Sequence, residues 1–114
     1  MKFKDKQILG KLIDETTIIM QMIDGLNYNG FLNDEKTKRA VCMTLINIGE
    51  LVKNISDELK SDYPEIPWRA ISGLRDITAH KYQTLRMEDV WKTAISDVEP
   101  LKQRLEKMLE RDSK

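Results

Sequence analysis

The feature that most constrains the fold is an apolar seam in the middle of the chain. Six apolar residues follow one another at alternating steps of four and three, the spacing that places side chains on one face of an α-helix. The seam consists of Val41, Leu45, Ile48, Val52, Ile55 and Leu59. A helix with such a stripe buries it against other helices. The seam therefore predicts a helix over residues 33–60, with Asn33 as its N-cap.

The rest of the chain shows the same helical period. Apolar stripes predict a first helix over residues 4–26, a short third helix over 67–79 and a fourth over 88–111. Pro100 should kink or open the fourth helix because proline removes a backbone hydrogen bond. Close approach of two helices would explain Gly73 inside the third. No strand pattern is present, so we expect an all-α fold: an up-and-down bundle of three long helices and one short helix, in one domain over residues 1–114.

Charge is balanced over the whole chain but not locally. The 19 basic residues equal the 19 acidic ones, which argues against a general nucleic-acid coat protein. Residues 68–86 nevertheless hold four basic residues against the single acid Asp76, a net charge of +3. This positive charge surrounds the only histidine, where an RNA or nucleotide phosphate would need it. The alternative is a solvated charged face with no ligand.

Cysteine and histidine usage excludes two kinds of site. The single cysteine, Cys42, cannot form an internal disulfide, and the start of the chain lacks a signal-peptide pattern, so we expect a cytoplasmic protein. No apolar run reaches the eighteen residues typical of a membrane span, so no membrane partner is expected. One histidine and one cysteine cannot make a typical zinc site. A magnesium site built from carboxylates is the open alternative, but no cluster of aspartates and glutamates indicates one. We therefore expect neither a metal nor a cofactor.

Arg75 and His80 are the candidate catalytic residues. Histidine moves protons near neutral pH, and the arginine fork binds phosphate oxygens with two parallel hydrogen bonds. On a straight helix, residues five apart are rotated by about 140°, so His80 should lie at or beyond the end of the third helix, or a second copy of the chain should complete the site. The alternative is a surface arginine with a histidine at a helix C-terminus.

Neighbouring side chains extend this candidate site. Ser72 and Asp76 lie one helical turn apart, and Asp76 could orient Arg75 or His80, or offset the local positive charge. Glu50 lies off the apolar seam and could form an ion pair with Arg75, although an ordinary surface glutamate is the alternative. Tyr82 adds a phenol two residues after the histidine. RNA cleavage at such a site needs no metal if the 2′-hydroxyl of the substrate attacks the adjacent phosphate.

Four sequence boxes resemble the HepT-like branch of the HEPN superfamily, which are small all-helical RNase toxins. Residues 47–50 are similar to its I-G-E box, and residues 63–68 resemble its P-x-I-P-W entry to the third helix. The stretch 71–82 matches its R-x4-H-x-Y motif and flank. Residues 87–101 resemble its last-helix pattern. The resemblance spans roughly residues 40–109.

The resemblance implies a function and its control. It implies that Arg75 and His80 form a metal-independent RNase site in a cleft between two copies of the chain, a homodimer. It implies that the partner is an MntA-type nucleotidyltransferase antitoxin of a type VII toxin–antitoxin system, which silences the toxin by AMPylation of Tyr82. One departure is Asp76, where many relatives carry asparagine; an aspartate partly neutralises Arg75 and would lower its affinity for phosphate.

Two other functions fit the same residues. One is a non-catalytic, nucleotide-binding helical partner of a nucleotidyltransferase, which needs the same surface but no proton transfer. The other is a structural dimerisation module, in which substitution of Arg75 or His80 would change stability by about 1 kcal/mol or less.

Overall fold

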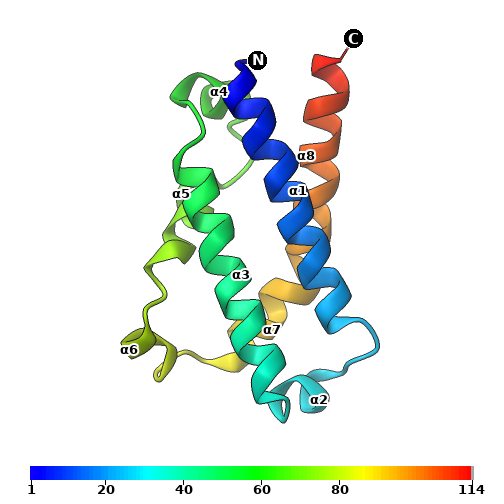
Figure 1. Ribbon diagram of the computed structural model, residues 1–114, viewed down its shortest axis with the longest axis vertical. Helices are drawn as coiled ribbons and strands as arrows, with labels where there is room; N and C mark the ends of the chain where they lie inside the picture. Colours follow the sequence, from blue (N-terminus) through cyan, green and yellow to red (C-terminus); the bar gives the residue numbers. More distant parts are fainter. Residues whose placement is uncertain (114) are drawn as a thin grey trace.

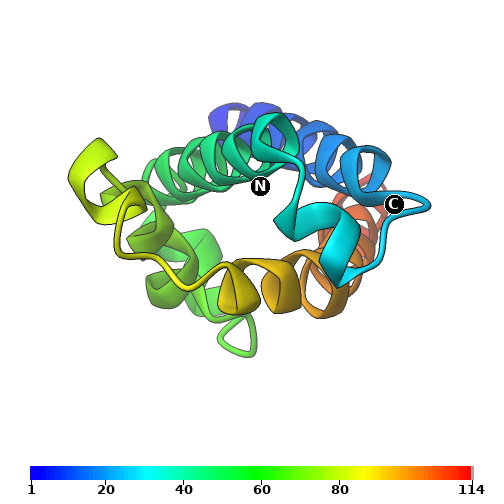
Figure 2. The same cartoon turned by 90° about the horizontal axis from the view of Figure 1, so that it is seen from below.

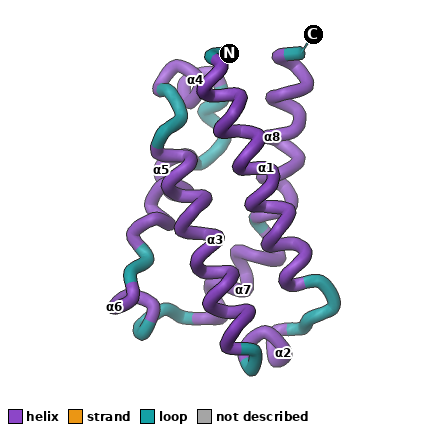
Figure 3. Tube along the Cα trace, in the orientation of Figure 1, coloured by secondary structure: helices purple, strands orange, loops and turns teal. Residues whose placement is uncertain are grey.

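Three long helical segments form the body of the protein in the computed structural model, which describes residues 1–113. α1 (Phe3–Ile23) and α3 (Glu35–Lys53) run antiparallel, and α7 (Met87–Ser96) continues into α8 (Val98–Asp112), which returns beside α1 (Figure 1). Both chain termini therefore lie at the same end of the bundle (Figure 1). All elements of residues 1–113 are helical, which confirms the predicted all-α, up-and-down bundle (Figure 3).

The turn after α1 contains a short helix that the hydrophobic pattern does not predict. Gly25 has a φ of +78°, a conformation that glycine adopts without strain, and it ends the first helix close to the predicted position. α2 (Tyr28–Leu32) follows, because the Asn27 side chain accepts a hydrogen bond of 2.8 Å from the Gly30 N–H and caps it. α2 places Phe31 in the core, where its ring centroid lies 5.1 Å from that of Trp91.

The second predicted helix is two helices in the structure. α3 begins after Asp34, not Asn33, and ends at Lys53; α4 (Asp57–Asp62) then starts in a new direction. Ser56 caps α4, and the buried carboxylate of Asp5 accepts hydrogen bonds from the Ser56 N–H at 3.0 Å and hydroxyl at 2.6 Å. All six seam residues are buried, as predicted, because the chain keeps the same apolar side inward through the break.

The third predicted helix is also divided. α5 (Trp68–Ser72) passes into a 3-10 turn, η1 (Gly73–Asp76), and a loop then leads to the separate short helix α6 (Ala79–Tyr82). Trp68 anchors the start of α5 in the core, and its indole N–H donates a 2.9 Å hydrogen bond to the Tyr63 carbonyl. Seen from below, the segment of residues 79–82 lies outside the ring formed by the long helices (Figure 2).

The fourth predicted helix opens near the proline, as expected. The break is at Asp97, between α7 and α8, and Pro100 lies in the first turn of α8. A proline is tolerated there because the first N–H groups of a helix have no partner within it. Buried side chains from all three long segments form one hydrophobic cluster. Within residues 1–113, no helix is long and apolar enough to cross a membrane.

Candidate active site

Gly49 allows η1 to cross α3 at very short range. A Cβ atom at position 49 would lie 2.5 Å from the backbone nitrogen of Arg75 and 3.1 Å from the carbonyl oxygens of Ile71 and Ser72. Any side chain there would push the backbone of Arg75 away from α3. By contrast, a Cβ at Gly73 would meet nothing within 4 Å. The close approach predicted for Gly73 is therefore wrong, and it belongs to Gly49 instead.

The crossing presents Arg75 beside two carboxylates. Its Nη1 lies 3.3 Å from Glu50 Oε1, and its Nε lies 3.8 Å from Asp76 Oδ1. The predicted ion pair with Glu50 is therefore present, and Asp76 forms a second ion pair with the same guanidinium. Arg75 remains one-third exposed, and both acids are more than half exposed. Pairs in this setting contribute about 0–1 kcal/mol, so a phosphate can replace either carboxylate at little cost.

Ser72 stays outside this cluster. Its hydroxyl donates a 3.0 Å hydrogen bond to the Arg69 carbonyl, one turn earlier in α5. Its own carbonyl faces Gly49. Ser72 therefore stabilises the α5–η1 corner locally, and its side chain makes no hydrogen bond to Arg75 or Asp76.

His80 lies in α6, beyond the end of η1, as the sequence predicts. Ile77 and Thr78 have extended backbones, and the Thr78 hydroxyl caps α6 by accepting a 3.1 Å hydrogen bond from the Lys81 N–H. The imidazole is exposed and forms no hydrogen bond or ion pair with any described residue. No hydrogen bond joins Arg75 to His80 within the described part of one chain.

Tyr82 is held by charged residues at the start of α3. Its hydroxyl donates a 3.2 Å hydrogen bond to Glu35 Oε1, and the Arg39 guanidinium carbon lies 5.0 Å from the centre of its ring. Glu35 also pairs with Lys38 Nζ at 2.9 Å and with Arg39 Nε at 2.9 Å. We call Glu35, Lys38, Arg39 and Tyr82 the Tyr82 clasp. The sequence alone does not identify its three α3 members as part of the site. The spacing of Glu35 and Arg39 indicates an ion pair on a helix, but their contact with Tyr82 depends on tertiary structure.

Electrostatics keep the clasp in one protonation state. Burial raises the pKa of the Tyr82 phenol, and the Glu35 carboxylate raises it further. The hydrogen bond from Lys38 lowers the pKa of the Glu35 carboxyl, and the bond from Tyr82 acts in the same direction. Near neutral pH the phenol is therefore a donor and Glu35 an ionised acceptor.

The candidate site is elongated along α3. Glu35 and Glu50 are fifteen residues apart, which corresponds to about 22 Å along the axis and a rotation of about 60°. Both glutamates thus lie on one side of α3. Arg75 is anchored near one end of this side and Tyr82 near the other, with His80 on the connecting segment (Figure 1).

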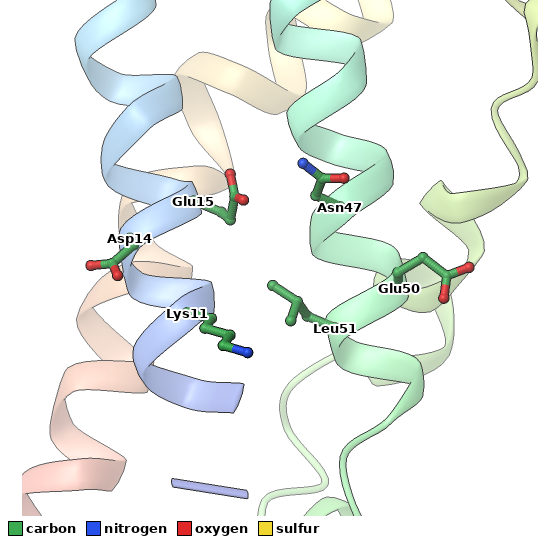
Figure 4. A pocket seen from close by; sticks show the side chains of 6 residues that line it. All are labelled: Lys11, Asp14, Glu15, Asn47, Glu50 and Leu51. Atoms are coloured by element: carbon green, nitrogen blue, oxygen red, sulfur yellow. The ribbon is translucent and has the colours of Figure 1, made fainter. Parts of the chain in front are cut away.

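A shallow depression adjoins the Arg75 end, between α1 and α3. Its lining comprises Lys11, Asp14, Glu15, Asn47, Glu50 and Leu51. Lys11 and Leu51 face the gap between the helices, whereas Glu50 points away from α1 (Figure 4). Three carboxylates against one lysine make the depression unfavourable for phosphate. Within residues 1–113, no three His, Cys, Asp or Glu side chains gather as metal ligands.

Comparison with known proteins places these features in a family context. The family model "Ribonuclease HepT-like" matches residues 12–108. "Probable ribonuclease HepT" of Thermococcus cleftensis is 35% identical over 108 residues, which cover 95% of this chain and 98% of the relative. "Putative RNase MJ1216" of Methanocaldococcus jannaschii is 31% identical over 104 residues, 91% of this chain and 86% of the relative. No solved structure matches the chain significantly.

Proposed function

The chain belongs to the HepT-like ribonuclease family, and from this premise we propose that it is a metal-independent endoribonuclease with Arg75 and His80 as its catalytic residues. The observation that carries the proposal is the crossing at Gly49, which holds a partly exposed guanidinium beside exchangeable carboxylates. The local net charge of +3 over residues 68–86 supports RNA as the substrate.

The proposed reaction uses the 2′-hydroxyl of the RNA as nucleophile. His80 takes the proton of this hydroxyl, and the oxygen attacks the neighbouring phosphorus. The 5′-oxygen leaves with a proton from a general acid, and the products are a 2′,3′-cyclic phosphate and a 5′-hydroxyl. Arg75 binds the non-bridging oxygens as their charge increases, after a phosphate has displaced Glu50 or Asp76. Proton transfer of this kind contributes about 10²–10⁴-fold to the rate.

A second copy of the chain would complete this chemistry. The reaction needs a base and an acid, and each chain contains one histidine. No hydrogen bond joins Arg75 and His80 within the described part of one chain. We therefore propose a homodimer in which each copy supplies one histidine to a shared cleft.

The proposed control point is Tyr82. In this proposal a nucleotidyltransferase antitoxin transfers AMP from ATP: the phenol oxygen bonds to the α-phosphorus, pyrophosphate leaves, and the phenol proton passes to a base. The product carries a negative phosphodiester and extra bulk at α6, where it competes with RNA for the basic segment. The pairing would make the chain the toxin of a type VII toxin–antitoxin system.

Cleavage of labelled RNA by the purified protein tests the enzymatic proposal. The parent and Glu58→Gln, an exposed substitution on α4, are expected to cleave with a chelator present, whereas His80→Ala is expected to be inactive. Equal cleavage by the parent and His80→Ala would refute the assignment of His80. Loss of all activity on chelation would refute metal independence.

A non-catalytic partner of a nucleotidyltransferase is the second candidate. One observation favours it: Arg75 is already paired with two carboxylates, and no hydrogen bond joins it to His80. This function predicts a parent protein without RNase activity and binding to the nucleotidyltransferase that persists in His80→Ala.

A further inference from the structure

The segment that holds His80 has one anchoring side chain. Of residues 78–84, Tyr82 alone has a partly buried side chain, and the other six are exposed. α6 has only four residues, which is too short for a helix to be stable by itself. Figure 2 shows this segment outside the ring of the long helices. Leu85 packs on the core after this segment, so within α6 itself the side-chain attachment is through the contacts of Tyr82.

Those contacts are the Tyr82 clasp. The hydroxyl bonds to Glu35 at 3.2 Å, Arg39 lies over the ring at 5.0 Å, and the ring packs on the edge of the hydrophobic core. Glu35 is itself fixed by Lys38 and Arg39, each at 2.9 Å. A fixed acceptor gives the hydrogen bond a defined direction, so the clasp locates the phenol on α3.

His80 shares one helical turn with Tyr82 but has no anchor of its own. Its ring forms no hydrogen bond or ion pair with a described residue, so the imidazole is placed only through the backbone of α6. We propose that Tyr82 is a positioning residue for His80, acting through its hydrogen bond to Glu35. This inference rests on the proposed RNase function and adds Glu35 as the residue that carries the positioning.

The same bond explains how a change at the phenol oxygen would act at a distance from the reacting phosphate. A phosphodiester on that oxygen removes the only proton that the phenol can donate. It also brings a negative charge beside the Glu35 carboxylate, which repels it, and beside Lys38 and Arg39, which attract it. The hydrogen bond to Glu35 is then lost, and with it the bond that locates the phenol on α3.

Kinetics of four proteins test the positioning role: Tyr82→Phe, Glu35→Met, the double variant, and Glu58→Gln as the exposed control. Both single variants keep the size of the side chain and remove one partner of the bond. We expect kcat for RNA cleavage to fall by about tenfold in each, with KM little changed, because misplacement of about 1 Å costs up to about 10²-fold. The double variant should be no slower than either single variant. Losses that multiply in the double variant, or singles as active as Glu58→Gln, would overturn the proposal.

A structural measurement separates this inference from the proposed function. His80 is the only histidine, so its ring Hε1 proton gives one assignable NMR signal in the untagged protein. Both single variants should shift this signal and lower the heteronuclear NOE of residues 79–82, with the amides of α1 unchanged. Unchanged signals in both variants would overturn the clasp as the anchor, whatever the activity. A parent without RNase activity would refute the proposed function, while the NMR result would still decide the role of Glu35.

Discussion

The two halves of the candidate site are held in different ways. Arg75 is fixed by backbone packing, because η1 lies directly on Gly49 of α3. His80 lies on α6, where Tyr82 is the side chain that packs on the core and bonds to α3. The first attachment depends on the core and cannot be released without disrupting the fold. The second combines the packing of one ring with a hydrogen bond between one hydroxyl and one carboxylate, so a chemical change at the phenol oxygen weakens it. Under the proposed function, such a site would keep its phosphate-binding half constant and leave its proton-transfer half open to control.

The largest expected effect comes from removing the positive charge of Arg75. Arg75→Ala should lower RNA cleavage by about 10²–10³-fold, the usual loss when one donor to a transition-state oxyanion is removed. Its stability should change by less than about 1 kcal/mol, because both ion pairs are partly exposed. Arg69→Ala, which removes an exposed charge from the same basic segment, is the matched control. Equal losses in the two variants would show that only overall charge matters.

The next effect tests the packed half directly. Gly49→Ala should destabilise the protein by about 1–3 kcal/mol, because its Cβ would lie 2.5 Å from the Arg75 nitrogen and the crossing must open. Gly73→Ala should be neutral or stabilising by up to about 1 kcal/mol, since the site is open and its φ of −64° suits alanine. Urea denaturation of both variants measures the difference. Equal stability of the two variants would contradict the account of the crossing.

Hydrogen exchange compares the two halves in the unmodified protein. Amides of α6 should exchange through local opening that costs little free energy. For the central amides of α3, the free energy of the opening that permits exchange should approach that of global unfolding. Tyr82→Phe should speed exchange in residues 79–85 and leave residues 41–52 unchanged. Protection of α6 equal to that of α3 would mean that both halves are held by the core.

Acid pH should produce the smallest effect, at the clasp end of α3. The hydrogen bonds from Thr37 lower the pKa of Asp34 below its ordinary 3.8, and Lys38 lowers that of Glu35 below its ordinary 4.5. Lowered pKa values mean stability that is present above these ordinary values and is lost as the pH falls below them. The urea midpoint should therefore decrease from pH 6 to pH 3, and less so in Asp34→Asn. An identical decrease in Asp34→Asn would exclude the Asp34 cap as a source.

The bundle could be predicted from the sequence because the spacing of apolar residues continues across the breaks between helices. Val52, Ile55 and Leu59 are all buried, although Ile55 lies between two helices and Leu59 belongs to α4. The hydrophobic pattern does not predict the break itself, because it depends on Asp5. This buried carboxylate of α1 accepts hydrogen bonds from Ser56, which lies 51 residues away in the sequence. Periodicity reports which side is buried, and it does not report where a distant side chain ends a helix.

The candidate site could be predicted only in part, for the same reason. The Arg75–Glu50 pair was anticipated from the off-seam position of Glu50, and the structure confirms it. An isolated glycine in a predicted helix suggests close approach at Gly73 as readily as at Gly49, and only the crossing in the folded protein distinguishes the two. Glu35 and Arg39 resemble any surface pair on a helix. Their link to Tyr82 appears once the chain has folded back on α3.

The most direct test of the central claim is the chemistry at the cut itself. An RNA that carries a single 2′-deoxy nucleotide at the cleavage position should resist the enzyme there. The unmodified RNA should yield 2′,3′-cyclic phosphate and 5′-hydroxyl ends with a chelator present. Cleavage of the deoxy-substituted RNA at that position, or products with 3′-hydroxyl and 5′-phosphate ends, would contradict the proposed roles of Arg75 and His80.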